Sequence, residues 1–112
     1  MKHAKATGAE AAMYQRLQAY LSLAFYSISN QNINSRQDAA AQHFVTLYKL
    51  VDNSNSEAWY FSAILNARNK KPKLVKADLL KAISNGFNDK ARLMQQPEFQ
   101  GIDLAEIISK MK

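Results

Sequence analysis

Apolar residues recur along the chain at intervals of three and four, the spacing that places them on one face of an α-helix. The first such stripe runs from Ala9 to about Ile28 and consists of Met13, Leu17, Tyr20, Ala24 and Ile28. Leu21 and Phe25 widen it, so we expect this helix to contact neighbours on more than one side. The polar residues 29–35 follow, and their Asn and Ser side chains compete with helix by bonding to the backbone. They are predicted to form a connector.

A second helix is predicted from a cap at Asn34 or Ser35 to about Val51. Its expected buried stripe consists of Ala40, Phe44, Leu47 and Val51. The short connector makes the first two helices neighbours, so they are expected to pair as an antiparallel hairpin.

The segment from Asp52 to Phe87 reads as a second hairpin with clear boundaries. Ser54 and Glu57 form a capping-box pattern after a turn, which predicts the start of a third helix. That helix is crowded with apolar residues and is the expected centre of the core: Trp59, Tyr60, Phe61, Ala63, Ile64, Leu65 and Ala67. Pro72 suits the first turn of a fourth helix, and Gly86 suits a left-handed cap at its end. The predicted buried face of this fourth helix is Val75, Leu79, Ala82 and Ile83.

Two short helices are predicted at the C-terminal end. Asn88 or Asp89 caps the first, which should stop before Pro97. The last begins at a capping-box pattern of Asp103 and Glu106, and its apolar face is Leu104, Ile107, Ile108 and Met111. Residues 1–8 lack periodicity and are expected to be a flexible tail, so residues 9–112 form the single predicted domain. With only 3 Gly and 2 Pro and no alternating β-branched run, the fold class is all-α.

The two hairpins are offset by about 39 residues, which indicates internal repetition of stacked helical hairpins. The second hairpin resembles a tetratricopeptide repeat at Trp59 and Ala63 on its first helix and at Leu79 and Ala82 on its second. At Ser62, Asn66 and Val75 the sequence departs from the family's pattern. The first hairpin fits with Tyr20, Leu23, Ala24 and Ser27, then Ala41 and Val45. The segment 86–99 resembles the closing part of bacterial repeat proteins, and the chain is expected to be the C-terminal part of such a protein. The alternative is a non-repeat helical bundle.

In the tetratricopeptide repeat family the first helix of each hairpin lines a concave groove. By position, the resemblance places Leu21, Phe25, Ile28, Tyr60, Ile64 and Arg68 on that surface. It implies a scaffold-like, non-enzymatic module that binds a protein or peptide of unknown identity. The alternative is that a terminal helix, or the remainder of a longer protein, buries these residues.

The net charge of +6 is concentrated in one predicted turn between helices. Residues 58–76 contain five basic residues and no acid: Arg68, Lys70, Lys71, Lys73 and Lys76. We call these five the basic patch. A solvated turn is the favoured interpretation, with an acidic protein partner next. The alternative function is binding of nucleic acid or an anionic surface, although no exposed aromatic residues are predicted beside the patch.

No constellation of residues predicts an enzyme, a cofactor or a metal site. The chain has no cysteine, its acidic residues are scattered singly, and it contains no glycine-rich phosphate loop. His43 is expected to be packed or half exposed on its helix. His3 could hold Cu(II) or Ni(II) in vitro if Met1 is the true, unblocked amino terminus. No apolar run is long enough to span a bilayer or to serve as a signal peptide. The chain is expected to be soluble, and the sequence leaves its compartment open: cytoplasmic, or exported if a signal peptide has been removed.

Overall fold

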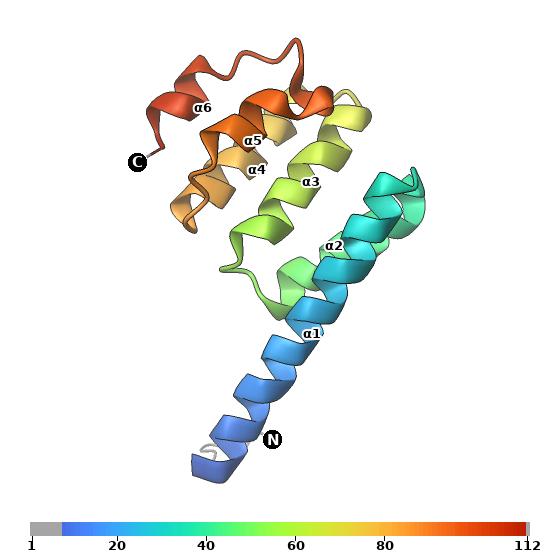
Figure 1. The fold of residues 1–112 in the computed structure, drawn as a ribbon, viewed down its shortest axis with the longest axis vertical. Helices are drawn as coiled ribbons and strands as arrows, with labels where there is room; N and C mark the ends of the chain where they lie inside the picture. Colours follow the sequence, from blue (N-terminus) through green and yellow to red (C-terminus); the bar gives the residue numbers. More distant parts are fainter. Residues whose placement is uncertain (1–7, 112) are drawn as a thin grey trace.

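The computed structural model describes residues 8–111, and this part of the chain contains helices and no strand (Figure 1). The elements are α1 (Gly8–Asn34), α2 (Asp38–Val51), α3 (Ser56–Arg68), α4 (Pro72–Ser84), α5 (Lys90–Gln95), the 3-10 helix η1 (Pro97–Phe99) and α6 (Ala105–Ser109). The all-α prediction is confirmed for these residues. Residues 1–7, including His3 and most of the predicted tail, lie outside the described part.

Two antiparallel hairpins, α1–α2 and α3–α4, lie side by side, with α2 packed against α3 (Figure 1). The C-terminal elements complete the core, because η1 contacts α3 and α6 contacts α4. As predicted, α3 is the centre of the core, and its buried residues are Ala58, Tyr60, Phe61, Ser62, Ala63, Ile64 and Leu65. This helix therefore has protein on nearly all sides.

The predicted end of the first helix is wrong, because α1 continues through the polar stretch to Asn34. Two residues of that stretch, Ser29 and Ile33, are buried, so tertiary packing overrides the low helix propensity of the segment. The Asn32 side chain donates to the Ile28 carbonyl oxygen at 2.8 Å within the helix and does not break it. The connector is correspondingly short.

The turn between α1 and α2 also differs from prediction. Neither Asn34 nor Ser35 caps α2, which begins at Asp38 after Gln37, a residue with no side-chain capping bond. Arg36 adopts a left-handed φ of 63°. Its amide donates to the Ile33 carbonyl at 3.2 Å, and the next amide donates to the Asn32 carbonyl at 2.9 Å. This is a Schellman arrangement without the usual glycine.

The buried face of α2 is rotated from the predicted one. Its buried residues are Ala41, Val45 and Tyr48. The predicted residues Ala40, Phe44, Leu47 and Val51 are all half-buried. The reason is that α2 contacts both α1 and α3, so the face between these two neighbours is the one fully enclosed.

The start of α3 uses a different cap from the predicted Ser54. Asn55 accepts the Glu57 amide hydrogen bond through its side-chain oxygen at 3.0 Å. The Asp52 carboxylate in the same turn accepts from Ser22 at 2.8 Å, which ties the turn to α1. Asn55 lies one residue after the predicted cap, so the predicted boundary is nearly correct.

Most later boundaries follow the sequence, but the predicted capping box of Asp103 and Glu106 is wrong. The N-cap of α6 is Leu104, which makes no side-chain capping bond, and Asp103 accepts from the Ala105 amide at 3.1 Å. Pro72 opens α4, and Gly86 adopts a φ of 105° after its end. Asp89 caps α5 by accepting from the Arg92 amide at 3.0 Å. In α6, Ile107 is buried, and the other predicted apolar residues pack against the core: Leu104, Ile108 and Met111. Helix α6 is shorter than its apolar pattern, which continues into the flanking residues.

Helix α1 projects well beyond its partner (Figure 1). It has 27 residues against 14 in α2, which correspond to about 40 Å and about 21 Å of helix. The Gln18 side chain donates to the carbonyl oxygen of Val51 at 2.8 Å, so α2 ends opposite Gln18. The residues of α1 before Gln18 therefore extend past the hairpin.

Candidate functional site

The predicted groove is closed at Tyr60 and Ile64, which are 0% and 3% exposed. The Tyr60 ring stacks on Phe87 with centroids 4.9 Å apart and meets the edge of Phe99 at 5.7 Å. Its hydroxyl donates to Gln96 Oε1 at 2.9 Å. The prediction that Tyr60 and Ile64 line an open surface is wrong, because the C-terminal segment covers this face of α3.

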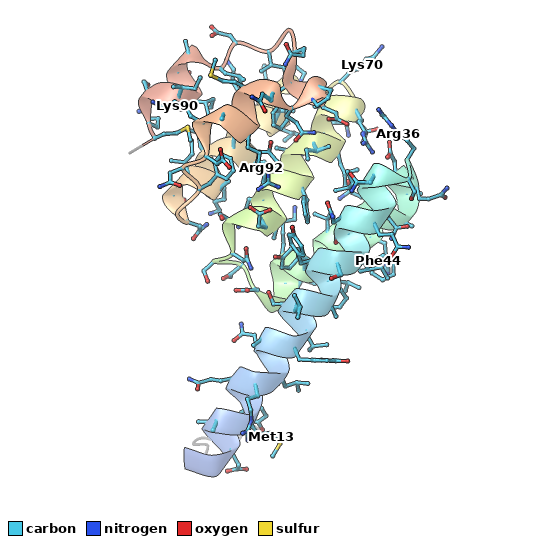
Figure 2. The ribbon with its side chains drawn as sticks, in the orientation of Figure 1. Met13, Arg36, Phe44, Lys70, Lys90 and Arg92 are labelled. Atoms are coloured by element: carbon cyan, nitrogen blue, oxygen red, sulfur yellow. The ribbon has the colours of Figure 1, made fainter. Side chains whose placement is uncertain are left out.

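Burial also changes the chemistry of this tyrosine. It raises the pKa of Tyr60 to about 12, although the nearby Arg92 guanidinium opposes the rise. That guanidinium lies 4.2 Å from the Tyr60 ring centroid and donates to Glu57 at 2.7 Å. Figure 2 shows Arg92 between α5 and α3. The tyrosine hydroxyl thus stays protonated near neutral pH and serves as a donor that holds α5.

Arg68 forms two ion pairs within the chain and is not available on an open groove. Its guanidinium pairs with Asp38 at 2.6 Å and with Glu98 at 2.8 Å, and its side chain is 10% exposed. Burial alone would raise the pKa of Glu98, but hydrogen bonds from Gln96 and Arg68 outweigh it and lower that pKa. Arg68 thereby links the start of α2, the end of α3 and η1.

The remaining groove residues lie on α1, and one of them, Phe25, contacts α2. Leu21, Phe25 and Ile28 are half-buried, and the rings of Phe25 and Phe44 lie 6.4 Å apart. A cleft of about 300 Å³ remains between the end of α1, α3 and the α5–η1 segment. Its lining includes Ile64 and Arg68 but none of the three α1 groove residues. The six predicted residues are therefore not gathered on one open surface.

Of the five residues of the basic patch, Arg68 is neutralised by ion pairs, whereas the four lysines are not. Lys70, Lys71 and Lys73 are exposed, and Lys76 is half-buried. None of these four is in an ion pair within residues 8–111. Lys70 holds a left-handed φ of 58° at the turn between α3 and α4. The patch is thus a cluster of solvated ammonium groups around one turn.

A different surface begins on the projecting part of α1 and continues past Gln18 as far as Leu23. Five large apolar side chains there are between 52% and 70% exposed: Met13, Tyr14, Leu17, Tyr20 and Leu23. We call them the α1 apolar face. Met13, Leu17 and Tyr20 follow each other at i, i+4 and i+7, so they share the centre of one helix face. Figure 2 shows Met13 near the end of α1 that lies far from the other helices.

The apolar periodicity of the sequence predicts the central stripe of this face, but the stripe was expected to be covered by a neighbouring helix. The missed signal is length. The turn at Asp52 marks the end of the second helix. The residue of α1 that lies opposite this end is Gln18, which bonds to Val51. Residues before that point have no partner helix available in the α1–α2 hairpin.

Neither a metal centre nor a membrane span is found in residues 8–111. No three acidic or histidine side chains there lie close enough together to hold an ion. No helix in this part combines the length and hydropathy that crossing a bilayer requires. The prediction that His43 is packed or half exposed is wrong, because its side chain is exposed on α2, where it meets Phe44 edge-on at 5.1 Å.

In the comparisons with known proteins, no family model matches the chain, and no curated protein or solved structure is significantly similar to it. The resemblance to tetratricopeptide repeats therefore rests on the residues quoted from the sequence.

Proposed function

We propose that this chain is a non-enzymatic protein-binding module of tetratricopeptide-like type, and that it binds its partner through the α1 apolar face. The observation that carries the proposal is the exposure of Met13, Leu17 and Tyr20 on a helix that extends past its neighbours. Contiguous exposed apolar residues on a folded protein are typical of interaction sites. This replaces the groove predicted from the sequence as the contact surface.

The energetic incentive for covering this face is substantial. Burying one Leu, Met or aromatic side chain from full exposure contributes about 1.5–3 kcal/mol. The five side chains are each more than half exposed, so covering them contributes on the order of 5 kcal/mol before the cost of association. The partner's own apolar residues add to this.

An amphipathic helix of another protein is the partner that this geometry favours. The face is a straight stripe along α1 with apolar residues every three or four positions, which matches the spacing of apolar residues on a second helix. Its flanks are widened by Tyr14 and Leu23, both more than half exposed. The stacked hairpins α1–α2 and α3–α4 would serve as the scaffold that presents it.

The test compares capture of cell proteins by three forms of the full chain. The double variant Leu17→Gln/Tyr20→Gln removes the centre of the face while keeping good helix formers. The matched control is Leu74→Gln, an exposed leucine on α4. We expect the wild type and the control to capture the same specific protein and the double variant to lose it. All three forms should give the same circular dichroism spectrum, which shows that they are equally folded.

Two results would overturn this assignment. One is unchanged capture by the correctly folded double variant. The other is a wild-type chain that sediments as a dimer which Leu17→Gln/Tyr20→Gln converts to a monomer, because a second copy would then cover the face.

The basic turn supports a second candidate function, binding of nucleic acid or an anionic surface. The supporting observation is that Lys70, Lys71 and Lys73 are exposed and have no ion pair within the described chain. Binding of a single-stranded oligonucleotide should then weaken by ~10-fold or more between low and moderate salt. It should also be lost in Lys71→Gln/Lys73→Gln, and absence of binding at low salt rejects this function.

A further inference from the structure

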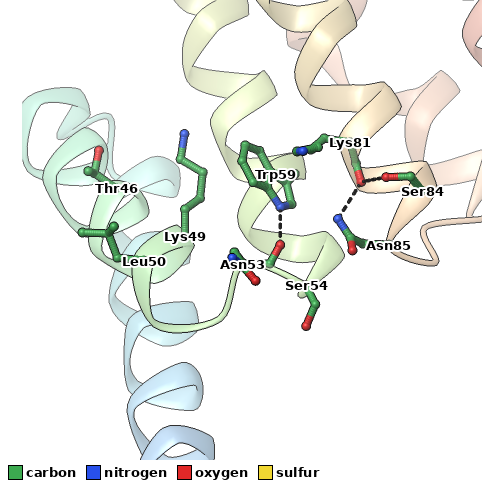
Figure 3. A pocket seen from close by; sticks show the side chains of 9 residues that line it. All are labelled: Thr46, Lys49, Leu50, Asn53, Ser54, Trp59, Lys81, Ser84 and Asn85. Atoms are coloured by element: carbon green, nitrogen blue, oxygen red, sulfur yellow. Dashed lines mark hydrogen bonds between the residues drawn. The ribbon is translucent and has the colours of Figure 1, made fainter. Parts of the chain in front are cut away.

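The indole of Trp59 forms a wall of a surface pocket of about 600 Å³ between α2, α3 and α4 (Figure 3). This pocket and the cleft of about 300 Å³ that is lined by Ile64 and Arg68 lie on opposite sides of α3. Trp59 and Ser62 are three residues apart and share one helix face, whereas Glu57 and Arg68, eleven residues apart, share the other. The lining of the pocket shares no residue with the Arg68 and Arg92 ion pairs or with the α1 apolar face.

Two lysines flank the fixed indole ring. The Trp59 Nε1–H donates to the Asn53 carbonyl oxygen at 2.8 Å, which sets the ring orientation. The Lys49 ammonium lies 5.0 Å from the ring centroid, and the Lys81 ammonium lies 5.5 Å from it. Figure 3 shows the indole between these two side chains, one from α2 and one from α4. The ring attracts both cations through its negative faces.

The positive charge of this pocket is not neutralised by any carboxylate in the described residues. Its lining contains Lys49 and Lys81 and no acidic residue. Neither lysine takes part in an ion pair within residues 8–111. Asp78, one turn before Lys81 on α4, instead accepts from Asn66 at 2.7 Å. A concave site with two uncompensated cations concentrates anions.

The donor set favours phosphate. Two lysine side chains line the pocket, and two cations suit a group that carries more than one negative charge. A phosphate monoester carries a charge of about −1.5 to −2 at neutral pH and three strong acceptor oxygens, whereas a carboxylate carries a single charge. Ser84 and Asn85 at the rim already donate to the Lys81 carbonyl, each at 2.9 Å, so their own oxygens are available as acceptors. Such acceptors suit the hydroxyl or amino groups of a sugar or base. The volume lies within the usual range for small-molecule pockets.

We propose that the pocket around Trp59 binds a phosphate-bearing small molecule, with its anionic group held by Lys49 and Lys81 and its remaining part against the indole. The proposal is independent of the protein-binding function, because it uses a different face and different residues.

The chain contains one tryptophan, so intrinsic fluorescence reports directly on this pocket. The full chain is titrated separately with ADP, ribose 5-phosphate, inorganic pyrophosphate and adenosine. We expect a saturable change with at least one phosphate-bearing probe and none with adenosine. The tightest probe identifies whether the natural source is a nucleotide, a sugar phosphate or a free phosphate.

Variants separate lysine-dependent binding from a general salt response. Lys49→Gln and Lys81→Gln should each weaken the binding midpoint by ~10-fold, because each removes one of two charges that face the ligand. The control Lys90→Gln, an exposed lysine at the start of α5, should bind like the wild type. Calorimetry on the same samples checks affinity without relying on the changed indole surroundings.

Three outcomes would overturn the proposal. These are no saturable response to any phosphate-bearing probe at ~10 mM, a response that survives both lysine substitutions, and tighter binding of an acidic peptide than of every phosphate-bearing probe.

Discussion

Replacing Arg68 by methionine tests how three distant parts of the chain are held together. The substitution removes a guanidinium that pairs with Asp38 and Glu98 while keeping the length and apolar character of the side chain. The Asp38 carboxylate is 44% exposed, so that arm contributes at most about 1 kcal/mol. Glu98 is 9% exposed, and removing the partner of a buried charge costs about 3–5 kcal/mol.

The expected loss in the free energy of unfolding is therefore about 3 kcal/mol at neutral pH, since Gln96 still donates to Glu98 at 2.6 Å. This is a large share of the roughly 5–15 kcal/mol typical of a domain. Urea denaturation followed by circular dichroism measures it. Lys73→Met, an exposed residue of the same basic patch, is the matched control and should change the stability little.

The pH dependence gives an independent check. The folded-state pKa of Glu98 is lowered, so its contribution to stability is present above its unfolded pKa and is lost as the pH falls through the folded value. In Arg68→Met the main charged partner is gone and desolvation raises that pKa. The stability deficit relative to the wild type should therefore shrink on acidification, when Glu98 is protonated.

A further variant separates the buried charge from general loss of packing. Arg68→Met/Glu98→Gln has no buried carboxylate at this position and should recover part of the loss. A loss of unfolding free energy below about 1 kcal/mol in Arg68→Met, or a loss that is the same at every pH, would refute the conclusion that the Arg68–Glu98 ion pair stabilises the fold.

Four other substitutions test individual structural features by the same denaturation assay. Ser29→Ala should stabilise the fold by about 0.5–1 kcal/mol, because the buried Ser29 hydroxyl has no hydrogen-bond partner and alanine favours helix. Arg36→Gly should stabilise it by about 0.5–1 kcal/mol by removing the cost of a left-handed φ. Asn55→Ala should cost about 1–2 kcal/mol through loss of the α3 cap. Tyr60→Phe should cost about 1 kcal/mol, because the hydrogen bond to Gln96 is lost.

Each of these has a clear contrary result. Destabilisation by Ser29→Ala would mean that the hydroxyl has a partner after all. A loss of stability in Arg36→Gly would show that the arginine side chain contributes more than its backbone costs. An unchanged free energy of unfolding in Asn55→Ala or Tyr60→Phe would show that the removed hydrogen bond does not contribute to stability.

Local signals in the sequence located the elements whose boundaries depend on nearby residues. Pro72, Gly86 and Asp89 begin or end helices because of their own backbone and capping chemistry, and each does so in the structure. The apolar crowding of α3 correctly identified the centre of the core. These features need no knowledge of distant segments.

The features that were not predicted depend on contacts across long sequence separations. The polar end of α1 stays helical because Ser29 and Ile33 are buried by tertiary packing. Arg68 resembles a solvated base in the sequence, yet both of its carboxylate partners are thirty residues away. The groove prediction failed at Tyr60 because its hydroxyl is held by Gln96, thirty-six residues later. Periodicity and charge runs carry no information on such pairings.

The projecting part of α1 has a consequence for local stability. An isolated helix of fewer than about 12–15 residues is marginal in water, and residues 8–17 lie beyond the end of α2. Their backbone amides should exchange with solvent far faster than those beside the buried Ser29 and Ile33. A partner bound to Met13, Leu17 and Tyr20 would slow that exchange. The hydrogen-exchange rate of residues 8–17 therefore measures whether the α1 apolar face is occupied.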